Sequence, residues 1–180
     1  SPHVETVPYC DILGSYGEEL SRAGRYDAAI EILKEAVDVD PLPGSEKKTV
    51  ALVNLGRIFT RFGKAEEGLQ YFRRAVEVTP RGAHAWYNLG VALVRTGNKE
   101  EGIRCLRKAI KFYPADTTPR LYLADLLKGA GDLDGAIEQY SEASKLEPTN
   151  AAIHNALGAA WEKIGNTTMA LGSYRRAVEL

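Results

Sequence analysis

Cysteine and histidine are scarce in this 180-residue sequence. The only cysteines are Cys10 and Cys105, and they form no C-x-x-C pair that could begin a metal site or a redox motif. Two cysteines so far apart cannot build a disulfide framework, so we expect reduced, structural thiols in an intracellular, cytoplasmic protein. The three histidines include no H-x-x-x-H pair. The sequence therefore predicts no metal site.

Long apolar runs and a surplus of one charge are also absent. No apolar stretch approaches the length that a bilayer requires, and the first ten residues lack the basic start and apolar segment of a signal peptide. Lysine and arginine number 23 against 24 aspartate and glutamate, a net charge of −1. Nucleic-acid-binding domains carry a basic surplus. We therefore expect neither a nucleic-acid partner nor a membrane.

Catalytic patterns are missing as well. The glycine-rich run 129–135 joins two expected helices with no strand before it, so it is a helix turn and not a phosphate-binding loop. Acidic residues are spread among basic ones, as on a solvated helix face. No nucleophile or acid–base pair stands out. The sequence predicts a protein that is not an enzyme and that needs no cofactor.

What the sequence does contain is an internal repeat. Four prolines stand 39, 34 and 34 residues apart, at Pro41, Pro80, Pro114 and Pro148. A turn glycine recurs at Gly24, Gly63, Gly97, Gly131 and Gly165. A small residue recurs at Ala29, Gly68, Gly102, Ala136 and Ala170, and a large one follows at Leu33, Phe72, Leu106, Tyr140 and Tyr174. Small residues let antiparallel helices approach closely, and large ones fill the space beside them.

This pattern predicts ten helices in five hairpins. Their expected ranges are 10–23, 26–40, 46–62, 65–79, 83–96, 99–113, 117–130, 133–147, 151–164 and 167–180. The first spacing is five residues longer because of an insertion at 41–48. Within it, Ser45 is the expected N-cap of the third helix.

The spacing and the residue types resemble the tetratricopeptide repeat (TPR) family over residues 10–180. The resemblance implies an all-α, right-handed solenoid of antiparallel helix pairs. Residues 1–9 would be an N-terminal extension, followed by repeats at about 10–43, 49–82, 83–116, 117–150 and 151–180. The tryptophan that the family carries near each repeat start occurs only in the third repeat, at Trp86.

In that family the first helices of successive hairpins line a concave groove that receives an extended peptide or a partner helix. The resemblance implies a peptide-binding groove at Val50, Val53, Asn54, Arg57, Arg61, His84, Tyr87, Asn88, Val91, Arg95, Leu121 and Tyr122. Its apolar members would have no reason to cluster in solvent unless a partner covers them. The alternative is that some of them point into the hairpin interface.

Two sets of polar side chains bear on what such a groove would bind. Asn54 and Asn88 share one repeat position, which resembles the asparagine ladder of the O-GlcNAc transferase repeat arm, so they could hold a peptide backbone. Four cations recur at one repeat position and, with Arg57, could bind an acidic ligand: Arg22, Arg61, Arg95 and Lys163. Alternatively, these four cations only complement the helix dipole in the last turn. Of the family's clamp for chaperone C-termini, only Asn54 matches, so chaperone tails are not expected partners.

The sequence thus predicts a protein–protein interaction scaffold. Two alternatives stay open: an assembly element of a large complex, or the substrate-recognition arm of an enzyme whose catalytic domain lies outside this chain. The sequence stops inside a repeat, and we expect the parent protein to continue with another helix. The side chains Leu171, Tyr174, Val178 and Leu180 repeat a pattern that the next hairpin should cover. We therefore expect them to form an exposed end through which the chain self-associates.

Overall fold

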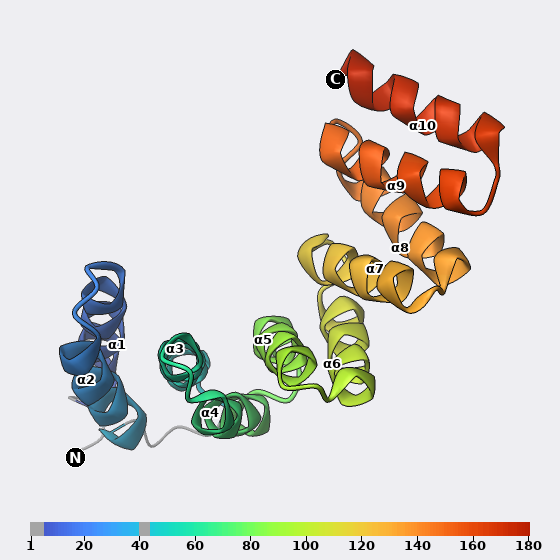
Figure 1. The fold of residues 1–180 in the computed structure, drawn as a ribbon. Helices are drawn as coiled ribbons and strands as arrows, with labels where there is room; N and C mark the ends of the chain where they lie inside the picture. The colour runs from blue at the N-terminus through green and yellow to red at the C-terminus, as the bar shows by residue number, and fades with distance from the viewer. Residues whose placement is uncertain (1–5, 40–43) are drawn as a thin grey trace. The chain divides into compact units, whose positions relative to one another are not determined.

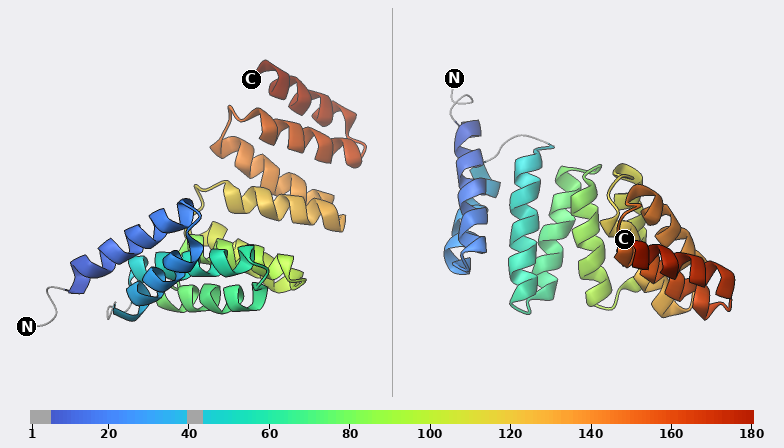
Figure 2. Two further views of the ribbon diagram at one scale, coloured as in Figure 1. Left: turned by 60° about the vertical axis from the view of Figure 1, so that its left-hand side comes forward. Right: turned by 90° about the horizontal axis from the view of Figure 1, so that it is seen from above.

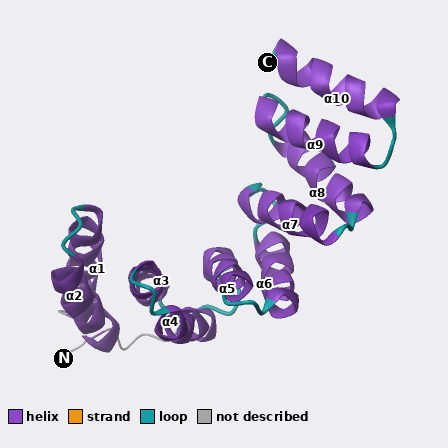
Figure 3. Ribbon diagram, viewed as in Figure 1, coloured by secondary structure: helices purple, strands orange, loops and turns teal. Residues whose placement is uncertain are grey.

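The computed structural model describes residues 6–39 and 44–180, which contain ten helices and no strand (Figures 1 and 3). The helices are α1 (Thr6–Arg22), α2 (Tyr26–Val39), α3 (Glu46–Arg61), α4 (Ala65–Val78), α5 (Ala83–Arg95), α6 (Lys99–Phe112), α7 (Thr118–Ala130), α8 (Leu133–Leu146), α9 (Ala151–Lys163) and α10 (Thr167–Glu179). All ten predicted helices are present. The largest difference is at α1, which begins at Thr6, so part of the expected N-terminal extension is helical. Pro41 and the side chain of Cys10 lie outside the described residues.

The chain forms two compact units, each of which we describe by itself. Unit 1 is Ser1–Phe112, with α1 to α6, and unit 2 is Tyr113–Leu180, with α7 to α10. Within unit 1 the hairpins α1–α2, α3–α4 and α5–α6 are joined by packing of α2 on α3 and of α4 on α5 (Figure 2). Within unit 2 the hairpins α7–α8 and α9–α10 are joined by packing of α8 on α9. These stacked antiparallel pairs are the all-α helical-repeat fold that the sequence predicts.

The helix ends follow from the residues that stand there. Ser45 caps α3, since its side-chain oxygen accepts a hydrogen bond of 3.2 Å from the Lys48 backbone N–H. This confirms the predicted cap. The five turn glycines all have positive φ, from 76° at Gly24 to 91° at Gly97. Residues that have a Cβ atom are sterically disfavoured in this left-handed region, which explains why glycine ends the first helix of every hairpin.

The core of unit 1 is built around α3. Leu52 and Leu55 of that helix are fully buried, and Phe72 of α4 packs across Gly56. The two helices of the third hairpin, α5 and α6, also approach closely. A Cβ added at Gly102 would stand 2.8 Å from the Gly90 carbonyl oxygen and 3.2 Å from the Val94 backbone nitrogen. The small residues therefore do set the distance between the paired helices.

The one cysteine whose side chain is described, Cys105, lies buried between α5 and α6. Burial is the main reason why the pKa of this thiol is raised, since the thiolate would lose its hydration. Such a thiol is a poor nucleophile at neutral pH, which agrees with the structural role expected for it. None of the helices within residues 6–39 and 44–180 combines the length and apolarity needed to cross a bilayer.

Candidate functional site

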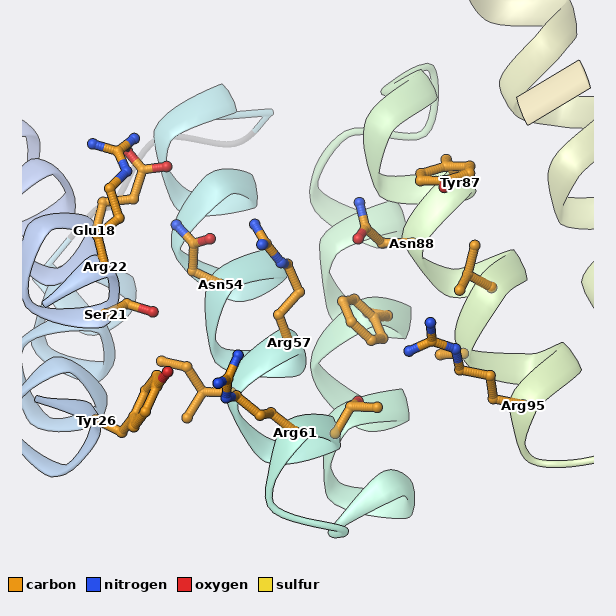
Figure 4. Close-up of a pocket in the computed structure, with 15 residues that line it drawn as sticks. Glu18, Ser21, Arg22, Tyr26, Asn54, Arg57, Arg61, Tyr87, Asn88 and Arg95 are labelled. Carbon is orange, nitrogen blue, oxygen red and sulfur yellow. Dashed lines mark ion pairs between the residues drawn. The ribbon is translucent and has the colours of Figure 1, made fainter. Parts of the chain in front are cut away.

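Unit 1 contains a groove of about 760 Å³ between α1, α3 and α5 (Figure 4). Its lining residues are Glu18, Ser21, Arg22, Tyr26, Asn54, Arg57, Ile58, Thr60, Arg61, Phe72, Tyr87, Asn88, Val91, Ala92 and Arg95. The lining residues of α3 and α5 stand at equivalent repeat positions. Within each helix they are three and four residues apart, so they share one helix face. Asn54, Arg57 and Arg61 on α3 therefore match Asn88, Val91 and Arg95 on α5.

Four arginines and one glutamate give the groove a positive lining. Arg22 is partly neutralised, since its guanidinium lies 3.6 Å from the Glu18 carboxylate and also pairs with Glu19. The Arg61 guanidinium lies 5.4 Å from the centre of the Tyr26 ring, a favourable cation–π contact. Within the part of the chain that the structure describes, Arg57 and Arg95 have neither an ion pair nor a hydrogen bond through their side chains.

The two asparagines at equivalent positions differ in their hydrogen bonds. The Asn88 side-chain nitrogen, Nδ2, donates to the His84 backbone oxygen at 2.8 Å. The Asn54 side chain is only 7 % exposed, and its Nδ2 has no acceptor among the described residues. A buried N–H without an acceptor costs about 1–3 kcal/mol. Asn54 therefore lines the groove with its unused donor buried, whereas the donor of Asn88 is already bonded within its own helix.

The structure brings seven of the predicted groove residues together and leaves others apart. The seven are Asn54, Arg57, Arg61, Tyr87, Asn88, Val91 and Arg95. Figure 4 shows Asn88 and Arg95 directed from α5 toward α3. Val50 and His84 are exposed but do not line the groove. Leu121 and Tyr122 are half-buried on α7, in unit 2, and so are not part of the unit 1 groove.

Val53 was expected to be exposed in the groove, and this was wrong. Its side chain is 1 % exposed. The cause is the crowding of α3, which packs against α1, α2, α4 and α5 and so has several sides covered. Val53 therefore belongs to the core, as the alternative interpretation of the apolar positions had it.

Three lining residues from the first hairpin were not predicted: Glu18, Ser21 and Tyr26. The fourth, Arg22, was expected only as one of the recurring cations. Glu18 and Arg22 occupy the repeat positions of Arg57 and Arg61, so the repeat alignment itself was the available signal. Tyr26 lines the groove beside Arg61, which it contacts through its ring. The repeat pattern does not predict this contact.

The predicted end face lies on α10 in unit 2. Leu171, Val178 and Leu180 are exposed. Tyr174 is half-buried, because its ring packs across Gly158 and its hydroxyl donates to Glu162 at 2.8 Å. Apart from Ala170, no residue of this helix is buried. In the described ranges, no three histidine, cysteine, aspartate or glutamate side chains gather as a metal site would require.

Comparison with protein families assigns most of the chain. Two models of the tetratricopeptide repeat match residues 9–81 and 50–117, and a model described as TPR repeat matches residues 124–165. No curated protein sequence matches the chain significantly.

Solved structures give the same fold. A crystal structure of MamA is 24 % identical, with 91 % of this chain and 92 % of that chain covered and a TM-score of 0.77. A second MamA structure is also 24 % identical, with 94 % of this chain and 90 % of that chain covered and a TM-score of 0.78. The structure of YrrB, described as a TPR protein with an unusual peptide-binding site, is 20 % identical. It covers 93 % of this chain and 84 % of its own chain, with a TM-score of 0.71. With repeat models matched in both units and this fold throughout, the chain belongs to the tetratricopeptide repeat family.

Proposed function

We propose that this chain is a protein–protein interaction scaffold whose unit 1 groove binds an extended peptide segment bearing acidic side chains. The observation that carries the proposal is the pair of unneutralised cations, Arg57 and Arg95, beside the unused donor of Asn54. Charged and polar groups held in place without partners are what a complementary ligand would satisfy. Preformed helices hold them, so binding need not order the site first.

Arg57 favours the ligand interpretation over the helix-dipole one. Arg61 and Arg95 are the last residues of α3 and α5, where any cation complements the negative end of a helix. Arg57 stands a full turn earlier, where the dipole effect has fallen off, and its side chain is exposed in the groove. A carboxylate between α3 and α5 would give both Arg57 and Arg95 a charge-assisted hydrogen bond.

The rest of the groove suits the remainder of a peptide. Ile58, Val91 and Ala92 make part of the groove lining apolar, and the Asn54 amide, once its buried Nδ2 turns toward the groove, can donate to a backbone carbonyl of the ligand. YrrB, which shares the fold, is itself described as having a peptide-binding site. The proposed occupant is therefore a strand-like segment with acidic side chains toward the arginines.

The arginine contribution can be tested with a fluorescein-labelled pool of nonapeptides carrying Asp or Glu at alternate positions. Reversing Arg57, Arg61 and Arg95 to Glu should weaken binding by about 10- to 100-fold, because each exposed charge pair is worth about 0.2–1 kcal/mol and becomes repulsive. Fluorescence anisotropy measures the affinity, and added salt should weaken wild-type binding in the same direction.

The matched control for this charge reversal is Arg74→Glu/Arg81→Glu/Arg107→Glu, which changes the net charge equally at exposed positions outside the groove. This control should bind the acidic pool nearly as the wild type does, and a pool with Lys in place of Asp and Glu should not bind. Equal affinity of both triple variants would contradict a specific acidic-peptide groove.

Asn54 and Asn88 provide a second test with one substitution at two equivalent positions. Asn54→Ala should weaken binding of the acidic pool by about 3- to 10-fold, the worth of one hydrogen bond, without lowering stability, because it removes an unpaired buried N–H. Asn88→Ala should change binding less, because its donor already serves the His84 carbonyl. Anisotropy and thermal unfolding measure the two effects, and a larger binding loss in the Asn88 variant would refute the assignment.

We also propose, as a second function, self-association through the outer face of α10. Its support is the exposure of Leu171 and Val178, which together present a surface that water solvates poorly. This interaction uses unit 2 and leaves the unit 1 groove available to a peptide.

A further inference from the structure

The exposed side chains of α10 stand at repeat positions that are buried or half-buried in the earlier repeats. Leu171 is 50 % and Val178 is 87 % exposed. Three repeats earlier the same positions are Leu69 and Val76, which are buried on α4, a helix that packs on α5. In the two repeats between, Ile137 is buried, and Ile103, Ile110 and Ser144 are half-buried. The outer face of α10 is thus the surface that the first helix of a following hairpin covers elsewhere.

A second such surface lies on α1, in unit 1. Ile12 is 64 % and Tyr16 is 50 % exposed. In the second, third and fifth repeats, the residues equivalent to Ile12 are Ala51, Ala85 and Ile153, and those equivalent to Tyr16 are Leu55, Leu89 and Leu157. All six are buried, in helices that pack on the second helix of the preceding hairpin: α3 on α2, α5 on α4, and α9 on α8. Among the described residues, no helix covers the outer face of α1 as α2, α4 and α8 cover α3, α5 and α9.

One internal contact shows how the two faces would fit. Val76 of α4 and Leu89 of α5 line the same small cavity, so these two repeat positions face one another across the junction of two hairpins. Their equivalents are Val178 on α10 and Tyr16 on α1. From this correspondence we infer that α10 of one copy packs on α1 of a second copy, head to tail, with Val178 against Tyr16. The inference rests on the proposed self-association and names the surface that α10 meets.

Charge favours this pairing over α10 on α10. On α1 the exposed Glu19, which also pairs with Arg22, lies three residues after Tyr16 and so on the same helix face. On α10 the exposed Arg175 lies four residues after Leu171 and three before Val178, and so on their face. A carboxylate and a guanidinium would therefore meet where α1 covers α10, whereas two copies of α10 would bring two arginines together.

Head-to-tail contact uses two different patches, so each added copy presents a fresh α1 face and a fresh α10 face. Wild-type chain should therefore give an average mass that keeps rising above the 19.7 kDa monomer as concentration increases. Sedimentation equilibrium measures this. Ile12→Glu/Tyr16→Glu and Leu171→Glu/Val178→Glu should each abolish the rise. Because all four side chains are exposed, both variants should keep the wild-type circular dichroism spectrum.

The decisive measurement mixes the two variants in equal amounts. Each retains the face that the other has lost, so the mixture should form a one-to-one heterodimer and no larger species. Ile164→Glu, at an exposed residue between α9 and α10, is the matched control and should associate like the wild type. If the α1 variant still dimerises alone while the α10 variant does not, α10 pairs with itself: self-association stands and the head-to-tail inference is overturned. A wild type that remains monomeric at every concentration overturns both.

Discussion

Truncating Phe72 to alanine is expected to lower the free energy of unfolding of unit 1 by about 3–5 kcal/mol. The ring is buried between α3 and α4, where a Cβ added at Gly56 would approach it to 2.6 Å. That packing leaves no neighbouring side chain free to fill the space, so the loss of burial is joined by the cost of a cavity. Because the ring also lines the floor of the groove, the variant should bind the acidic pool more weakly.

The two tryptophans allow the units to be followed separately. Trp86 lies in unit 1 and Trp161 in unit 2, so in a Trp161→Phe background the fluorescence change on urea unfolding reports unit 1 alone. The matched control is Phe62→Ala. The Phe62 ring is exposed and makes an edge-to-face contact with Tyr26, with 5.1 Å between the ring centres. This substitution should lower the free energy of unfolding by about 1 kcal/mol. If Phe72→Ala and Phe62→Ala lowered the free energy of unfolding equally, the junction of α3 and α4 would not be a closely packed core.

Replacing Gly102 with leucine should cost unit 1 about 3 kcal/mol or more. Even a methyl group there would meet the Gly90 carbonyl and the Val94 backbone nitrogen, which are main-chain atoms and cannot rotate away. The helices α5 and α6 would have to separate, and the packing of Leu106 across Gly90 would be lost with their contact.

The same substitution at Gly172 provides the contrast. This glycine lies within α10, and the space around its Cβ position is open. Leucine should therefore stabilise unit 2 by up to about 1 kcal/mol, through its better helix propensity. In a Trp86→Phe background, Trp161 reports that unit. Opposite signs for the two glycines are expected, and a stabilised Gly102→Leu variant would contradict the close approach of α5 and α6.

The helices and their ends were predictable because local chemistry decides them. The Ser45 side chain caps a helix through a hydrogen bond to a backbone N–H three residues away. Gly63 and Gly165 end helices because glycine readily adopts a positive φ. The division between the units was not predictable. Pro114 follows its helix at the same spacing as Pro80 and Pro148, so the sequence carries no mark at the boundary.

The groove was predictable in part. Repeat positions identify which side chains of α3 and α5 face one way, and this placed Asn54, Arg57 and Arg95 correctly together. The number of neighbours around a helix is not visible in such a pattern, which is why Val53 was assigned to the surface. Hydrogen bonding is likewise invisible, so the sequence could not distinguish the unused donor of Asn54 from the bonded one of Asn88.

The unequal burial of the helices has a consequence for amide hydrogen exchange. Nine of the sixteen residues of α3 are buried, against a single one in α10. The amide hydrogens of α3 can reach deuterated solvent only when its neighbours open with it, whereas α10 can fray alone. Asn54 and Arg57 thus stand on a slowly exchanging helix, so the geometry that a ligand meets persists through the faster openings elsewhere in the chain.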